Sequence, residues 1–234
     1  MFYNLKFQMI PQSNSNEGAM EPLRDFSIGE NGKRSVADIA GVLLSRIRVA
    51  KFHKYIKKSG DPVELLDIGC GYEAHLSINF INKVERIYLA DVSINTNLLR
   101  FPGVVFLRGD LNKTVKSLSD NSIDLIIASN VIEHLSDPRF ILMELSRLLK
   151  PGGMLMIIVP NWRGKSLLEF MAFKLRISPA YEINDHKWYF SKSELWTLIR
   201  SAGFSPEFIK IKTVKFGTCT YAIVSNPMKR SHNE

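Results

Sequence analysis

The feature that most constrains this chain is an alternation of short β-rich runs with amphipathic stretches, which extends from Pro62 to Pro160. The clearest amphipathic stretch is Pro138–Leu149, where apolar residues recur at helical spacing. The β-rich runs are Val63–Ile68, Glu85–Ala90, Val104–Arg108, Ile123–Ser129 and Gly153–Val159. Such alternation is typical of βαβ units, whose strands form a parallel sheet with helices on both faces. The sequence therefore predicts an α/β fold with a doubly wound sheet.

Four polar residues stand at or just after the ends of successive predicted strands. They are Asp67, Asp91, Asp110 and Asn130, spaced 24, 19 and 20 residues apart. In open α/β sheets the ligand lies outside the carboxyl ends of the strands. We therefore expect these four side chains to line one crevice.

The alternation of strand-like and helix-like segments ends after Pro160. A largely apolar stretch, Ser166–Ile177, and a second segment, Ser191–Ser201, both have helical character. Two final strands, Glu207–Lys212 and Gly217–Val224, follow with no helix between them. Strands with a short link form a hairpin, so we expect the sheet to end in an antiparallel edge.

Cysteine usage and the start of the chain favour a reducing, cytoplasmic compartment. Cys70 and Cys219 are the two cysteines of the sequence, which is too few for a disulfide framework. The first residues lack the basic start, apolar run and cleavage site of a signal peptide.

Positive charge is concentrated between Lys33 and Lys58. This stretch contains eight basic residues and one acidic residue, Asp38, so it carries +7 of the formal net charge of +8. The concentration fits a nucleic acid or an anionic membrane surface as partner. A helix face in contact with water explains it equally simply, and we expect this second interpretation to hold.

A glycine-rich turn follows the first predicted strand. Gly69 and Gly71 allow a tight bend and a close approach of the backbone to a ligand. Asp91 lies 20 residues after Gly71, at the end of the next strand, where an acid accepts hydrogen bonds from ribose hydroxyls. This combination indicates an adenosine-containing ligand and fits either a nicotinamide or a nucleoside cofactor.

The motifs together resemble those of the class I S-adenosylmethionine-dependent methyltransferases, of the small-molecule, methyltransferase-11-like type. The motifs are Leu-Leu-Asp67-Ile-Gly-Cys-Gly, Leu-Ala-Asp91, Arg-Gly-Asp110-Leu, Asn130-Val-Ile-Glu-His-Leu and Leu-Lys-Pro-Gly-Gly153. The resemblance covers roughly residues 45 to 225. It implies a Rossmann-like, seven-stranded sheet, mostly parallel, with an antiparallel edge strand from the C-terminal hairpin.

The resemblance also implies S-adenosyl-L-methionine as cofactor and a role for each site residue. The turn from Gly69 through Cys70 to Gly71 would hold the methionine part, next to Asp67. Asp91 would bind the ribose hydroxyls. The roles implied further along the chain are the adenine amino group for Asp110, the adenine ring for Leu111 and the floor near the methyl group for Asn130. One departure is Glu73, which stands where the family has a third glycine.

These expectations divide the chain into parts. We expect a flexible arm over 1–32, a methyltransferase domain over 33–225 and a flexible tail over 226–234. Within the domain we expect a basic helix over 33–60, a cofactor-binding core over 61–160, an acceptor-side cover over 161–203 and a terminal hairpin over 204–225. Asn161, Trp162 and Tyr181 are candidates to line an acceptor pocket.

Methyl transfer from a sulfonium needs alignment of the reacting atoms and removal of a proton from a hydroxyl or amine acceptor. His134, just after the fourth strand, is the candidate general base, because histidine exchanges protons near neutral pH. His186 opens the segment before a later helix and is the second catalytic candidate. We therefore expect methyl transfer to an oxygen or nitrogen of a small or carrier-linked acceptor.

A magnesium site is an alternative use of the same residues. Glu133, His134 and His186 match the metal-binding positions of the small-RNA 2′-O-methyltransferases, and the ubiquinone-pathway O-methyltransferases share a similar segment. The leading glutamate of that motif is Asn130 here, and losing an anionic oxygen weakens a site for a hard cation. We rank the general-base hypothesis first, structural packing second and the metal site third.

Two other functions fit parts of the sequence. A nicotinamide-dependent oxidoreductase would use Gly69, Gly71 and Asp91, but the chain has no Tyr-x-x-x-Lys pair. A non-catalytic binding protein with the methyltransferase fold is the other alternative, and Glu73 in place of glycine favours it.

Overall fold

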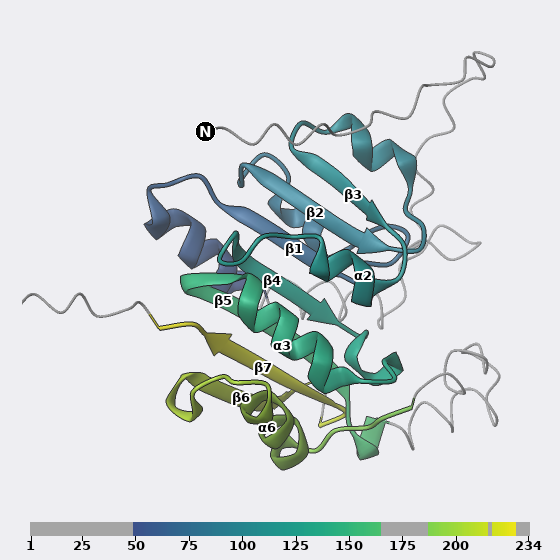
Figure 1. Ribbon diagram of the computed structural model, residues 1–234, viewed down its shortest axis with the longest axis vertical. Helices are drawn as coiled ribbons and strands as arrows, with labels where there is room; N and C mark the ends of the chain where they lie inside the picture. The colour runs from purple at the N-terminus through teal and green to yellow at the C-terminus, as the bar shows by residue number, and fades with distance from the viewer. Residues whose placement is uncertain (1–48, 165–186, 215–216, 228–234) are drawn as a thin grey trace, which may run out of the picture. The chain divides into compact units, whose positions relative to one another are not determined.

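The computed structural model describes residues 49–164, 187–214 and 217–227, which form a seven-stranded sheet in the order β3-β2-β1-β4-β5-β7-β6 (Figure 1). The strands are β1 (Glu64–Ile68), β2 (Arg86–Asp91), β3 (Val104–Arg108), β4 (Ile123–Ser129), β5 (Leu149–Pro160), β6 (Ile209–Val214) and β7 (Cys219–Ser225). The pairs β1–β2, β1–β4, β2–β3 and β4–β5 are parallel. The predicted α/β fold with a mostly parallel sheet is therefore confirmed.

The C-terminal hairpin supplies the antiparallel part of the sheet. β7 pairs antiparallel with both β5 and β6, from Met154↔Ser225 to Pro160↔Cys219 on the β5 side. The reversed strand β7 thus lies one position inside the sheet, and β6 forms the edge. β7 is buried over six of its seven residues, which fits a strand that has neighbours on both sides.

Among the described residues, three α-helices cover one face of the sheet, and another helix and two 3-10 helices pack on the other (Figure 1). The α-helices are α2 (Leu111–Lys116), α3 (Pro138–Leu148) and α6 (Lys192–Ser201). The other face packs against a helix over 49–59 and the 3-10 helices η1 (Ser77–Phe80) and η2 (Thr96–Arg100). Two further 3-10 helices are η3 (Ile132–His134) and η5 (Pro206–Phe208).

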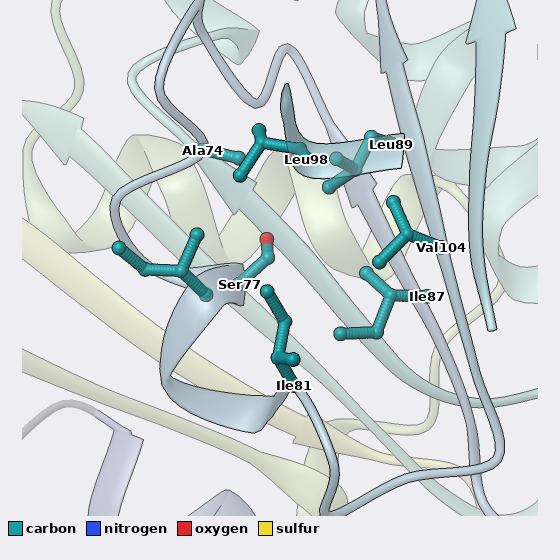
Figure 2. Close-up of a pocket in the computed structure, with 8 residues that line it drawn as sticks. Ala74, Ser77, Ile81, Ile87, Leu89, Leu98 and Val104 are labelled. Carbon is teal, nitrogen blue, oxygen red and sulfur yellow. The ribbon is translucent and has the colours of Figure 1, made fainter. Parts of the chain in front are cut away.

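The first helical element after the glycine-rich turn is the four-residue η1. Figure 2 shows how this short element closes onto the sheet through small and branched apolar side chains. The side chains that meet there include Ala74, Ile81, Ile87, Leu89, Leu98 and Val104. The apolar residues of η1 and η2 belong to one buried cluster with those of β2 and β3.

Helix boundaries follow local sequence signals. The helix over 49–59 is followed by Gly60, which has φ 66°. α6 begins with a capping box, in which Ser191 and Glu194 exchange side-chain to main-chain hydrogen bonds. Among the described residues no helix is long and apolar enough to cross a membrane.

Several predicted segments lie outside the described residues. They are the arm over 1–32, the start of the basic helix before residue 49, the apolar stretch Ser166–Ile177 and the tail after residue 227. The domain boundaries proposed from the sequence stay predictions.

Candidate active site

The turn after β1 depends on two glycines for different reasons. Gly69 has φ 60°, and a Cβ atom there would lie 2.5 Å from Cγ2 of Val131. Gly71 has φ 70°, and a Cβ atom there would meet nothing within 4 Å. Gly69 therefore lets the turn pack against the loop after β4, whereas Gly71 borders open space on the side where a ligand can approach.

Asp91 links this turn to the end of β2. Its Oδ2 atom accepts a hydrogen bond from the main-chain N–H of Gly71 at 2.8 Å, and Oδ1 accepts one from Val92 at 2.7 Å. A carboxylate has about four acceptor positions, so both oxygens retain capacity for further donors. Asp91 thus holds the turn in place and still offers two oxygens to a pair of hydroxyl groups.

Asp67 lies under the turn and does not face solvent. Its side chain is 2% exposed and accepts a short hydrogen bond from the hydroxyl of Ser77 in η1. Burial raises the pKa of Asp67 to about 7; the charge of Asp91 adds to this effect and the bond from Ser77 opposes it. Asp67 therefore connects β1 to η1, a role that the sequence did not indicate because Ser77 carries no motif.

Cys70 occupies the middle of the turn and is half-buried. Burial, followed by the nearby charges of Asp67 and Asp91, raises the pKa of its thiol. The raised pKa favours the neutral thiol over the nucleophilic thiolate.

Asp110 caps α2 at the end of β3. Its Oδ1 atom accepts hydrogen bonds from the main-chain N–H groups of Asn112 at 2.9 Å and Lys113 at 3.3 Å. Leu111, the next residue, is half-buried and packs against the core on the α3 face. The cap uses one oxygen, so Oδ2 of this exposed carboxylate lies outside the cap.

The loop after β4 carries Asn130 and His134. Asn130 has φ 52°, a left-handed conformation that asparagine tolerates, and its N–H donates to the carbonyl of Ile158 in β5 at 2.8 Å. His134 ends η3, and its N–H donates to the carbonyl of Val131 at 3.1 Å. The backbone of this loop is therefore fixed on both sides of the predicted base.

Glu133, next to His134, is a buried carboxyl that the sequence suggested only as a metal ligand. Its side chain is 0% exposed, and neither oxygen has a hydrogen-bond partner in the described structure. Burial raises the pKa of Glu133 to about 8. Its main-chain carbonyl accepts from Lys187 at 2.9 Å and from Trp188 at 3.2 Å, which ties the loop to the segment before α6.

His186 directly precedes this tied segment but lies outside the described residues, as does Tyr181. Among the residues at 49–164, 187–214 and 217–227, no group of three His, Cys, Asp or Glu side chains is arranged to hold a metal ion. The metal hypothesis therefore gains no support from the described part of the chain.

Glu73 occupies the third glycine position without starting a helix. Its Oε2 atom accepts a hydrogen bond from Nδ2 of Asn95 at 3.1 Å, while the N–H of Asn95 donates to the carbonyl of Tyr72 at 2.8 Å. Asn95 also caps η2. Glu73 therefore connects the glycine-rich turn to the loop after β2. In the sequence, the position of Asn95 as a helix cap was the only signal that could have indicated this contact.

Of the predicted acceptor-side residues, Asn161 has a structural task. Its Oδ1 atom accepts from the N–H groups of Arg163 at 3.1 Å and Gly164 at 3.0 Å, and its Nδ2 donates to the carbonyl of Gly217 at 2.9 Å. Trp162 is 52% exposed, and its ring centroid lies 5.5 Å from that of Tyr189. Trp162 thus presents an exposed aromatic ring just beyond the end of β5, and the buried Tyr189 supports it.

Comparisons with known proteins agree with this arrangement. A family model described as a methyltransferase domain matches residues 43–207. A probable S-adenosylmethionine-dependent methyltransferase of Mycolicibacterium smegmatis (strain ATCC 700084 / mc(2)155) is 28% identical over 149 residues, which cover 62% of this chain and 52% of that protein. Thiol S-methyltransferase TMT1B of Rattus norvegicus is 27% identical over 112 residues, 44% of each chain.

The fold is also shared with a solved carbon methyltransferase. The CurJ carbon methyltransferase superposes with a TM-score of 0.61 at 15% identity, covering 82% of this chain and 56% of that one. The chain spans about half the length of the Mycolicibacterium smegmatis and Rattus norvegicus proteins. Since the family model matches most of the sequence, the chain belongs to the methyltransferase domain family.

Proposed function

We propose that this chain transfers a methyl group from S-adenosyl-L-methionine to an oxygen or nitrogen atom of a small or carrier-linked acceptor. The observation that carries the proposal is the bond between the N–H of Gly71 and Oδ2 of Asp91, which joins the open turn to the acid after β2. The family match and the named relatives support the methyl-transfer part.

The residues present fit the cofactor. The open space beside Gly71 suits the methionine part, the remaining acceptor positions of Asp91 suit the ribose diol, and Oδ2 of Asp110 suits an adenine amino group. S-adenosylmethionine, when bound, supplies a methyl group on a positively charged sulfur. The chain's own residues then align the acceptor and remove its proton.

His134 is the proposed proton acceptor. It lies in η3, four residues after Asn130, in the loop that follows β4. An oxygen or nitrogen acceptor loses a proton as it becomes methylated, and a neighbouring imidazole can take that proton. The exposed ring of Trp162, packed on the buried Tyr189, offers an apolar surface on which an acceptor can rest.

The rival functions predict other ligands. A nicotinamide-dependent oxidoreductase would bind NAD or NADP, and a binding protein of this fold would bind cofactor without turnover. The antiparallel hairpin of β6 and β7 favours the methyltransferase reading, since it matches the sheet implied by the sequence resemblance.

Calorimetry of the full chain with S-adenosylhomocysteine tests the cofactor. We expect binding, and we expect Asp91→Ala to weaken it by about 1.5–3 kcal/mol, the range for hydrogen bonds to a charged group. Asp61→Ala, an exposed acid after the helix over 49–59, is the matched control and should bind as the wild type does. A wild-type chain that binds NAD but no S-adenosylhomocysteine would disprove the proposal.

Screening with a labelled methyl donor tests the acceptor atom. Phenols, catechols, amines and thiols form a suitable panel, because relatives act at different atoms: one is named a thiol S-methyltransferase and one solved structure a carbon methyltransferase. We expect label on oxygen or nitrogen. Transfer confined to thiols would replace this part of the proposal while leaving the cofactor assignment intact.

A further inference from the structure

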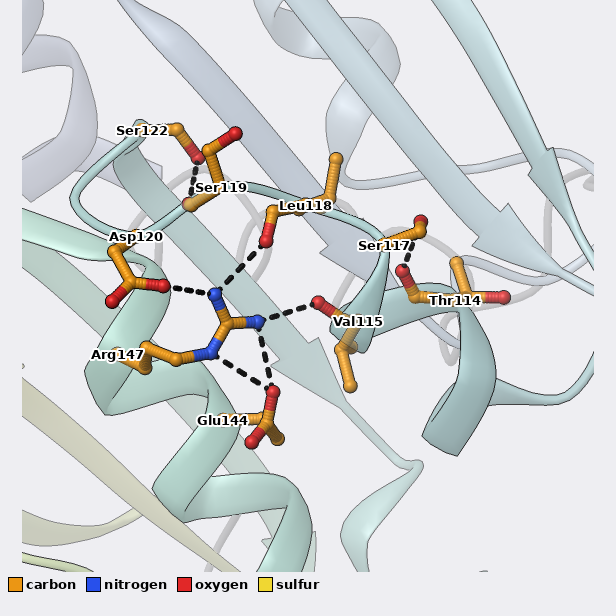
Figure 3. Close-up of polar contacts among 9 residues, drawn as sticks. All are labelled: Thr114, Val115, Ser117, Leu118, Ser119, Asp120, Ser122, Glu144 and Arg147. Carbon is orange, nitrogen blue, oxygen red and sulfur yellow. Dashed lines mark hydrogen bonds and ion pairs between the residues drawn. The ribbon is translucent and has the colours of Figure 1, made fainter.

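Arg147, on α3, makes a dense set of polar contacts with the end of α2 and the turn after it (Figure 3). Its Nη2 atom donates to the carbonyl of Val115 at 3.0 Å, and Nη1 donates to the carbonyl of Leu118 at 2.9 Å. Glu144 orients the guanidinium, since its Oε2 atom accepts from Nε at 3.0 Å and from Nη2 at 2.8 Å. Nη1 also pairs with the exposed Asp120.

The two main-chain carbonyls belong to the C-terminal end of α2 and the turn after it. The carbonyl of Val115 already accepts a long hydrogen bond from the N–H of Leu118, at 3.4 Å, and a side-chain donor adds a further bond that fixes this end in space. α2 has only six residues, and a helix this short has little stability of its own. Its position therefore depends on packing of Val115 in the core and on the bonds from Arg147.

The other end of α2 carries the predicted adenine-binding residues. Asp110 is the N-cap and Leu111 the first helical residue, and the hydroxyl of Thr114 donates back to the carbonyl of Asp110 at 2.9 Å. Val115 lies five positions after Asp110, about 7–8 Å along a helix. A displacement of the C-terminal end is therefore transmitted to the Asp110 carboxylate within a turn and a half.

We propose that Arg147 is a positioning residue for adenine recognition, which it serves by fixing α2 and, through it, Asp110 and Leu111. This inference rests on the proposed function. Arg147 acts through its forked geometry, because two carbonyls and the Glu144 carboxylate are reached by one planar group. A lysine keeps the charge but offers a single ammonium, so it cannot hold all three acceptors at once.

The test compares two ligands that differ only in the base. S-adenosylhomocysteine carries an amino group that can donate to Asp110, whereas S-inosylhomocysteine carries an oxygen there. We expect the wild type to prefer the adenosine form by roughly tenfold or more, the size of one hydrogen bond to a charged group. Asp110→Ala should abolish that preference and serves as the reference.

Arg147→Lys should bring the preference down to within a few-fold, and Glu144→Gln, a milder change, should lower it partway. Arg139→Lys is the matched control, since Arg139 also lies on α3 but donates to the carbonyl of Ser201 at the end of α6, at 3.1 Å. This variant should keep the wild-type preference. Melting curves of all variants show whether each one folds.

A purely structural Arg147 would change the affinity for both ligands equally, because general loosening does not distinguish the bases. An unchanged preference in folded Arg147→Lys, or an equal loss for both ligands, would overturn the positioning role alone. A wild type that binds neither ligand would overturn the proposed function as well.

Discussion

The two edges of the sheet use the same acidic residue type in opposite ways. At the carboxyl ends of the strands, Asp91 and Asp110 accept main-chain N–H bonds and retain oxygens for further donors. At the opposite edge, Asp124 at the start of β4 is 7% exposed and accepts from Lys150 at 2.7 Å, the N–H of Glu64 at 2.9 Å and the hydroxyl of Tyr55 at 3.5 Å. The first edge can still bind a ligand, whereas the second is buried and joins elements.

Glycines show the same division. Gly71 borders open space, but a Cβ atom on Gly153 would lie 2.8 Å from the carbonyl oxygen of Asp124 and 2.9 Å from that of Lys150. Both glycines belong to motifs that resemble the same family. One leaves room for a ligand and the other leaves room for the chain itself, so a motif residue can serve either binding or packing.

The largest expected effect is at the ligand-binding edge. His134→Ala should lower turnover by roughly 10²–10⁴-fold, the range for loss of a general base, with the affinity for S-adenosylhomocysteine unchanged. Steady-state assays together with calorimetry measure both quantities. His75→Ala, an exposed histidine in the turn before η1, is the matched control and should keep its turnover. Full turnover in folded His134→Ala would leave alignment of the acceptor as the source of catalysis.

The sequence predicted the sheet well because strand and helix periods and the turn glycines are local signals. The same signals placed Asp91 and Asp110 at strand ends, where the structure has them. Contacts between distant segments could not be predicted in this way. The bond of Ser77 to Asp67, that of Asn95 to Glu73 and the five bonds of Arg147 all depend on how the elements pack.

Glu133 is a buried carboxyl in the loop after β4, and among the described residues neither of its oxygens has a hydrogen-bond partner. Its pKa is raised to about 8 in the folded chain, above the ordinary value of 4.5, so the folded state holds this proton more tightly than the unfolded state. The contribution of Glu133 to the free energy of unfolding is therefore greatest below about pH 4.5, and it falls as the pH rises towards 8.

Glu133→Gln, which cannot ionise, should escape that loss. We expect it to be more stable than the wild type by on the order of 3 kcal/mol at pH 8, with the difference vanishing near pH 4. Urea unfolding at several pH values measures this. A constant difference across the pH range would show that Glu133 finds a partner for its charge.

A smaller effect on stability is expected at the buried edge around Asp124, with no change in cofactor binding. Asp124→Ala leaves the Lys150 ammonium and the Glu64 N–H without their acceptor, which should cost about 1–3 kcal/mol of unfolding free energy. The affinity for S-adenosylhomocysteine should stay at the wild-type value in the folded variant. Weakened cofactor binding at full stability would show that the two edges are coupled and would break the comparison between them.

The smallest effect concerns the basic face, which extends beyond the helix on which the sequence placed it. Burial lowers the pKa of Lys51, and the charges of Lys210 and Lys212 on β6 lower it further. Burial likewise lowers the pKa of His53, and the charges of Lys83 and Lys57 lower it further. Cations that lower one another's pKa repel, and an exposed group of this kind is most simply stabilised by water and salt.

We therefore expect no binding of the full chain to phosphatidylserine vesicles or single-stranded RNA at about 200 mM salt, and little at about 50 mM. Lys210→Gln with Lys212→Gln should raise the melting temperature slightly at low salt, because it removes repulsion from Lys51, and the gain should fade as salt is added. Lys113→Gln with Lys116→Gln on α2 is a charge-matched control on the opposite face of the sheet. Binding to either polyanion that falls steeply with salt and is lost in the β6 variant, but not in the α2 control, would contradict this expectation. The buried edge around Asp124 would then adjoin an interaction surface, and the two edges of the sheet would bind different kinds of ligand.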